Sequence, residues 1–183
     1  MPALYPGLHD EAVKKRHLRY ARSLVDAGYS FDMLVDEGRA DAQELVRDAL
    51  ALPDFTLGDQ DSGTVVRTPD GELAAVAVVT AVNYDNGTAL FVRALATAPA
   101  HRSTGIATVV LGLVPQILSQ VGMPTRSLVT GACPQERGSF FHRAGFLVLE
   151  PGDPLPYDFG GIEAELLDAT VPTDRCWFFR DVK

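Results

Sequence analysis

The chain has 183 residues, and 46% of them are hydrophobic, which is enough for one packed core and too apolar for a disordered chain. The net charge of −8 disfavours a nucleic-acid partner, because binding to phosphates depends on Lys and Arg. No apolar run reaches the roughly 20 residues that span a bilayer, and residues 1–10 lack the basic start and apolar block of a signal peptide. We therefore expect a cytoplasmic protein with neither a membrane nor a nucleic-acid partner.

The chain contains two cysteines, Cys133 and Cys176. We expect both thiols to be reduced, because no secretion signal precedes them. The sequence has no Cys and His spacing of the structural-zinc kind, so it predicts no metal.

The first third of the chain is predicted to be largely helical. Residues 10–28 and 41–52 each place apolar side chains on one helical stripe, and Pro53 ends the second pattern. The stripes consist of Val13, His17, Tyr20, Ala21, Leu24 and Gly28, and of Ala42, Leu45, Val46 and Ala49. Residues 29–38 mix apolar and acidic side chains and receive no assignment.

Strand patterns begin at residue 64. The nearly continuous apolar run of residues 72–82 is typical of a strand covered on both faces, and Pro69-Asp70-Gly71 before it is a turn sequence. Strands are expected at residues 64–67, 72–82 and 88–97, with a loop at residues 83–87.

The second half alternates helices and strands. A helix is predicted from about Ser103 to Val121, with a kink or break at Pro115, which has no backbone N–H to donate. The remaining elements are a strand at 127–130, a short helix at 134–144, and strands at 146–149 and 176–182. Residues 150–174 are rich in proline and acidic residues, and they are either a functional loop or a flexible surface insertion.

No linker interrupts the pattern, so we expect a single domain over residues 1–183. Its parts are a helical segment at 1–60, a core at 64–149, and an acidic loop with the last strand at 150–183.

The segment His101–Ala107 has the properties of an anion site. It joins a predicted strand to a predicted helix, and helix-start amides lack partners and carry partial positive charge. Gly105 lets a ligand approach the backbone closely, and Arg102 can pair with a phosphate through two hydrogen bonds. The hydroxyls of Ser103 and Thr104 can cap the helix or donate to a ligand. The segment therefore predicts a diphosphate site, and the alternative is an ordinary strand-to-helix turn.

Two common phosphate motifs do not fit this segment, because it has no Lys for a Walker loop and a single Gly where a dinucleotide fingerprint needs three. The string from Thr97 to Ala107 instead resembles motif A of the GCN5-related N-acetyltransferase (GNAT) superfamily. Arg102, Gly105 and Ala107 fill the fixed positions of its Arg/Gln-x-x-Gly-x-Gly/Ala core. Downstream, Phe140, Gly145 and Phe146 match the family's F-Y-x-x-x-G-F ending.

The resemblance implies an α/β (α+β) fold, with a mixed, strongly twisted sheet flanked by helices. It further implies that two central parallel strands splay apart and admit the pantetheine arm of acetyl-CoA, and that Cys133 and Cys176 lie side by side. The residues that it assigns to acetyl-CoA are Leu95, Ala96, Thr97, Arg102, Ser103, Thr104, Gly105, Ile106, Ala107 and Phe141.

The sequence departs from the family at the two positions that usually move protons. Residues 90–97 contain no acid where the family often has Glu, and Phe141 stands where the family often has a Tyr. The other candidates for a catalytic role are Asp85, Tyr84, Ser139, His142 and Cys133. Plainer readings are a turn for Asp85, a surface or cofactor-rim position for His142 and helix-start packing for Cys133. A further alternative is catalysis by proximity, with the proton lost to water.

We expect an acetyl-CoA-dependent N-acetyltransferase, an acyltransferase that acts on a primary amine. The acidic composition favours a small cationic acceptor. A non-catalytic acyl-CoA-binding regulatory module and an interaction protein without a ligand are the alternatives. In the family, variable flanks form the acceptor pocket, here residues 1–60 and 150–174. The oligomeric state stays open, with a homodimer as one option.

Overall fold

The computed structural model describes residues 10–84, 87–117, 127–160 and 175–182. The helices among them are α1 (Glu11–Asp26), α2 (Arg39–Leu50), α3 (Ile106–Leu113) and α5 (Gly138–Arg143), with short 3-10 turns η1 (Asp36–Gly38), η2 (Pro99–His101) and η3 (Gln135–Arg137). The strands are β1 (Ser30–Met33), β2 (Asp61–Arg67), β3 (Leu73–Tyr84), β4 (Gly87–Thr97), β5 (Ser127–Cys133), β6 (Leu147–Val148) and β7 (Cys176–Val182).

The described strands form one mixed sheet in the order β1-β2-β3-β4-β5-β7-β6. Among the described strands, only β4 and β5 pair in parallel, through residues 88–92 and 127–131. Beyond Val92 these two strands separate, and within the described part of the chain no strand pairs with the β5-facing edge of residues 93–97. The expected splay of two central parallel strands is therefore confirmed.

A bulge in β4 marks the point of separation. The register with β3 passes from Val78 opposite Ala94 to Val79 opposite Val92, so Arg93 is the extra residue. A bulge bends its strand and redirects the side chain of the added residue. The sheet therefore begins to open at Arg93.

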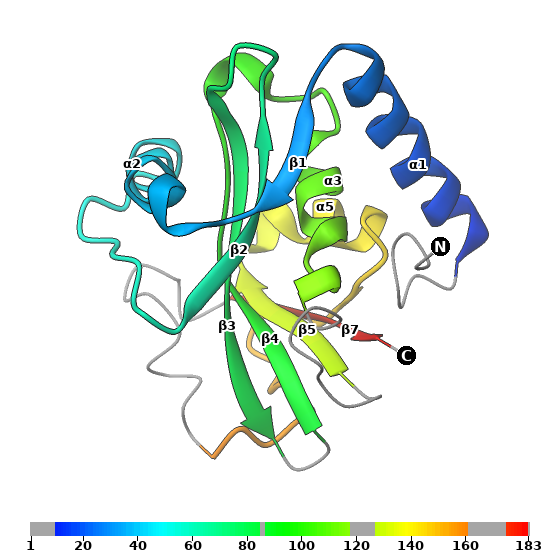
Figure 1. The fold of residues 1–183 in the computed structure, drawn as a ribbon. Helices are drawn as coiled ribbons and strands as arrows, with labels where there is room; N and C mark the ends of the chain where they lie inside the picture. Colours follow the sequence, from blue (N-terminus) through cyan, green and yellow to red (C-terminus); the bar gives the residue numbers. More distant parts are fainter. Residues whose placement is uncertain (1–9, 85–86, 118–126, 161–174, 183) are drawn as a thin grey trace.

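Helices cover both faces of the sheet, with α2 on one face and α1, α3 and α5 on the other (Figure 1). Seven of the eight residues of α3 are buried, because this helix packs between the sheet and α1. The face below α2 continues into an aromatic cluster that includes Phe91, Phe159 and Trp177. These layers leave the end of β4 and the start of α3 at one edge of the molecule.

Most predicted elements are present, with shifted ends. The unassigned residues 29–38 supply β1, which pairs with β2. The loop predicted at 83–87 is shorter, because Tyr84 pairs with Gly87 across the turn. The predicted break at Pro115 is confirmed, since α3 ends at Leu113 and residues 116–117 are helical again. Predictions for residues 118–121 and 161–174 lie outside the described residues.

The predicted start of the third helix at Ser103 is wrong. Ser103 and Gly105 have φ values of 65° and 85°, and an α-helix requires negative φ. The helix therefore begins only at Ile106, and Gly105 is its N-cap.

None of the described helices is both long and apolar enough to cross a membrane. The same residues contain no cluster of three His, Cys, Asp or Glu side chains that could hold a metal ion.

Candidate active site

The turn between β4 and α3 forms a concave set of backbone amides. Left-handed residues such as Ser103 and Gly105 redirect successive N–H groups and build an anion-binding concavity. Among the described residues, the N–H groups of residues 103–108 donate to no acceptor. The structure thus gives this turn the free donors that a diphosphate requires.

Side chains hold the turn in place. The Thr104 hydroxyl donates to the carbonyl of His101 at 2.7 Å, and the Tyr29 hydroxyl lies 2.9 Å from Nδ1 of His101. The Arg102 guanidinium donates to the carbonyl of Ala49 at 3.3 Å, at the end of α2. Arg102 is exposed, so the bond to Ala49 leaves the guanidinium within reach of a ligand.

Gly105 is required by packing as well as by its backbone conformation. A Cβ atom at this position would lie 2.4 Å from Cγ of Tyr20, which packs against the turn from α1. The sequence suggested only a close approach by a ligand. The ring of Tyr20 is a second reason for glycine, and only the tertiary structure reveals it.

The residues expected to contact the pantetheine arm lie along the open edge of β4. Leu95 and Thr97 are half-buried, and Ala96 is buried beneath α2. Phe141 lies in the core, where its ring stacks on Phe178 with the ring centroids 3.8 Å apart. The position that often carries a Tyr in the family is therefore filled by an apolar, buried ring.

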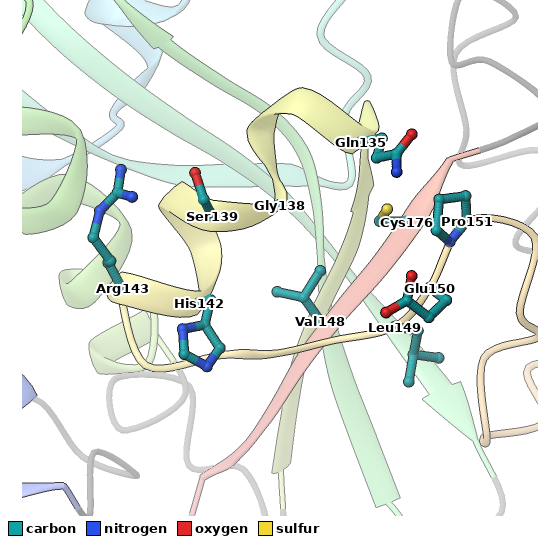
Figure 2. Close-up of a pocket in the computed structure, with 10 residues that line it drawn as sticks. All are labelled: Gln135, Gly138, Ser139, His142, Arg143, Val148, Leu149, Glu150, Pro151 and Cys176. Carbon is teal, nitrogen blue, oxygen red and sulfur yellow. The ribbon is translucent and has the colours of Figure 1, made fainter.

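The candidate residues on α5 lie at an open groove of about 420 Å³ between α5 and residues 148–151 (Figure 2). Ser139 and His142 are both exposed and point away from each other in Figure 2. Glu150 and Cys176 line the same groove. The structure therefore brings polar side chains together here, without a hydrogen bond between Ser139 and His142.

Cys133 and Cys176 face each other across β5 and β7, as the resemblance implied. Both are buried, and neither forms a disulfide within the described residues. Burial raises the pKa of Cys133 to about 12, and the neighbouring Cys176 and Glu136 add to this rise. A thiol that stays protonated at neutral pH is a poor nucleophile, which favours packing as its role.

Two other candidates lie elsewhere. Tyr84 packs in the aromatic cluster, with ring centroids 5.6 Å from Tyr157 and 5.5 Å from Phe159. Asp85 lies outside the described residues. None of the candidate residues predicted from the sequence is therefore a carboxylate that the structure places where β4 separates from β5.

A buried polar cluster was missed at the sequence level. Asp61 forms an ion pair with Arg93, accepts the Thr80 hydroxyl at 2.5 Å, and accepts the backbone N–H of Gly58 at 2.8 Å. The available signal was Arg93 itself, a single charge in an apolar strand, because a buried charge needs a partner. Its partner, 32 residues away, could not be named from the pattern.

The sequence profile described as the acetyltransferase (GNAT) family matches residues 28–146, which is more than half of the chain. The chain belongs to the GNAT acetyltransferase family. No curated protein sequence matches this GNAT protein significantly.

Solved structures agree with this family assignment. Nourseothricin acetyltransferase is 16% identical, with a TM-score of 0.51 over 85% of this chain and 98% of that one. A GNAT-family acetyltransferase from Staphylococcus aureus is 10% identical, with a TM-score of 0.57 over 85% of this chain and 99% of that one. N-acetylglutamate synthase from Neisseria gonorrhoeae, solved with coenzyme A and N-acetyl-glutamate, is 13% identical, with a TM-score of 0.57 over 85% of this chain and 35% of that one. At these identities the likeness establishes the fold.

Proposed function

We propose that this GNAT protein is cytoplasmic and transfers the acetyl group of acetyl-CoA to the primary amine of a small molecule. The observation that carries the proposal is the combination of an open backbone edge on β4 with a turn of unpaired amides at its end. The first suits an extended pantetheine arm, which can add to a sheet edge as a strand does. The second suits a diphosphate.

The residues present fit acetyl-CoA in both parts. Leu95, Ala96 and Thr97 would offer backbone groups to the pantetheine arm. The amides of residues 103–107, together with the Arg102 guanidinium, would hold the diphosphate. Bound acetyl-CoA supplies an activated thioester, from which an amine takes the acetyl group as the coenzyme leaves as a thiol.

The protein's own residues would act mainly by positioning. Direct attack needs a neutral amine, yet the described part of β4 carries no carboxylate, and Asp61 is already bonded to Arg93, Thr80 and Gly58. We therefore infer that the acceptor loses its proton to water. Holding two reactants together contributes roughly 7–11 kcal/mol in favourable systems, so transfer does not require a dedicated base.

The acceptor class is a further part of the proposal. The net charge of −8 and the acidic residues of the 150–174 segment favour a small cationic amine. Two of the structural relatives are acetyltransferases of nourseothricin and of aminoglycosides. Polyamines and aminoglycosides are therefore the first acceptors to test.

The test measures binding and turnover separately. Calorimetry with CoA reports binding, and release of free thiol from acetyl-CoA with a panel of amines reports transfer. We expect CoA binding together with amine-dependent thiol release. CoA binding without thiol release from any amine would refute transfer and fit the regulatory module, while absence of CoA binding would refute both.

A further inference from the structure

Two arginine side chains, one from β4 and one from the residue before β7, lie on the α2 face of the sheet. Arg93 projects from the bulge, and its side chain is 21% exposed, whereas that of Asp61 is 3% exposed. The guanidinium lies 5.1 Å from the ring centroid of Phe55, and Nη1 makes its bonds to Asp61 and to the carbonyl of Thr56. Among the described residues, Nε and Nη2 of Arg93 have no acceptor.

The second guanidinium belongs to Arg175, just before β7. It lies 5.2 Å from the ring centroid of Trp177. Its Nε is buried and has no hydrogen-bond partner within the described residues. A buried N–H without an acceptor is costly, so this position favours a ligand that can accept a hydrogen bond.

The sheet register places both groups on the same face. Asp61 pairs with Thr80, and Thr80 pairs with Phe91, so the ion-pair partner of Arg93 shares a face with Phe91. The Phe91 ring contacts Trp177 with the centroids 6.1 Å apart.

Half-buried Ala132, opposite Trp177 on β5, lies between the two arginine-bearing strands. Where β4 pairs with β5, at residues 88–92, β4 and β7 are two strand spacings apart, or about 10 Å, and beyond Val92 the two strands diverge. We call Arg93, Ala132, Arg175 and Trp177 the arginine patch.

We propose that the arginine patch binds an anionic group of the acceptor, a carboxylate or a phosphate, so that the acceptor is an amine that also carries a negative charge. This inference rests on the proposed acetyl transfer, and it departs from the purely cationic acceptor that the net charge alone favours. The start of α3, where the turn of unpaired amides ends, lies on the opposite face of the sheet from the arginine patch. Guanidinium groups recognise carboxylates and phosphates through two parallel hydrogen bonds.

The local charge at the arginine patch differs from the charge of the whole chain. Asp61 neutralises Arg93 and holds its guanidinium in place, which leaves free donor groups in a fixed orientation. Arg175 has no ion-pair partner in the described residues and adds a positive charge. An amine with a second, anionic group fits this arrangement better than a polyamine does, because a polyamine would be repelled by Arg175.

Binding can be measured without turnover, because Trp177 is the chain's only tryptophan and belongs to the patch. We would titrate the CoA-bound protein with matched pairs of ligands and follow tryptophan fluorescence. The pairs are amino acids of increasing chain length with their amides, and phosphoethanolamine with ethanolamine. We expect a saturable change with carboxylate or phosphate ligands, and the preferred pair tells which anion is bound.

Arg175→Gln is the main variant, because it removes the charge without exposing a buried partner. Arg22→Gln, an exposed arginine on α1, is the matched control. For the anionic acceptor we expect Arg175→Gln to lower kcat/KM by about 10- to 100-fold, and to change it little for the neutral partner. The double variant Asp61→Asn/Arg93→Gln replaces both charges of the ion pair and so removes the second guanidinium without leaving Asp61 unpaired. We expect it, like Arg175→Gln, to lower kcat/KM mainly for the anionic acceptor.

Several results would overturn the proposal. One is thiol release with polyamines or neutral amines at equal or better efficiency than with every anionic amine. Another is an equal loss for both members of a matched pair in Arg175→Gln. Because thiol release with any amine supports acetyl transfer, these outcomes leave the proposed function intact. Absence of turnover with every amine would refute the function itself, and no fluorescence response would then refute the patch as well.

Discussion

Gly105 offers the sharpest test of how this structure builds the turn between β4 and α3. Gly105→Ala adds a methyl group to a residue with a φ of 85°, which costs roughly 1–2 kcal/mol for an L-residue. The new Cβ would also lie 2.4 Å from the Tyr20 ring, so the ring must move. Overpacking of this kind typically costs about 1–3 kcal/mol. We therefore expect the free energy of unfolding to fall by about 2–5 kcal/mol.

Gly71 provides the matched control. It has nearly the same φ, 86°, but a Cβ there would meet nothing within 4 Å. Gly71→Ala should therefore show the backbone cost alone, about 1–2 kcal/mol. The double variant Tyr20→Ala/Gly105→Ala removes the overlap with the ring but keeps the backbone strain. Its free energy of unfolding should therefore lie about 1–2 kcal/mol below that of Tyr20→Ala, which is the loss expected for Gly71→Ala.

Urea denaturation measures these free energies of unfolding, and calorimetry measures how each variant changes the affinity for CoA. We expect Gly105→Ala to weaken CoA binding, while Gly71→Ala leaves it unchanged. A Gly105→Ala variant no less stable than Gly71→Ala would show that the Tyr20 contact is not tight. If both variants were as stable as the unmodified protein, the left-handed assignments themselves would be wrong.

Three further predictions concern pH, the ion pair and the cofactor. Burial, with Arg180 nearby, lowers the pKa of His17 from 6.5 to about 4. The unfolded state therefore gains its proton first, and the free energy of unfolding should fall by up to about 3 kcal/mol from pH 6.5 to pH 4. Urea titrations of His17→Leu should lack this slope, and an unchanged slope would rule out His17 as its source. Asp61→Asn should cost about 3 kcal/mol in urea, because Arg93 loses its counter-charge; a loss below about 1 kcal/mol would contradict a buried pair. Arg102→Ala should weaken CoA binding by about tenfold in calorimetry, and equal affinity would exclude Arg102 from the site.

Much of the fold could be predicted because its signals are local. The apolar stripes at residues 10–28 and 41–52 predicted α1 and α2, and the apolar run at 72–82 predicted β3. Pro115 marked the end of α3 for the same reason, since a missing N–H acts on its own turn. The fixed positions of motif A likewise identified the family that the profile match supports.

The rest depends on distant parts of the chain. The left-handed conformation of Ser103 delays α3 by three residues, and serine as a residue type does not signal it. Asp61 meets Arg93 only because three strands pair in a register with a bulge at Arg93. Tyr20 reaches Gly105 only because α1 packs against α3.

The sequence by itself determined most of the helices and strands, though not β1 or the start of α3, and it showed which turn has the pattern of a diphosphate site. The tertiary structure decided which charges meet, which edge of β4 is open and why Gly105 cannot change. Local periodicity depends on neighbours three or four residues apart, whereas register, bulges and packing are set by contacts between segments far apart in the chain. The arginine patch belongs to the second kind, since its two guanidinium groups come from β4 and from the residue before β7.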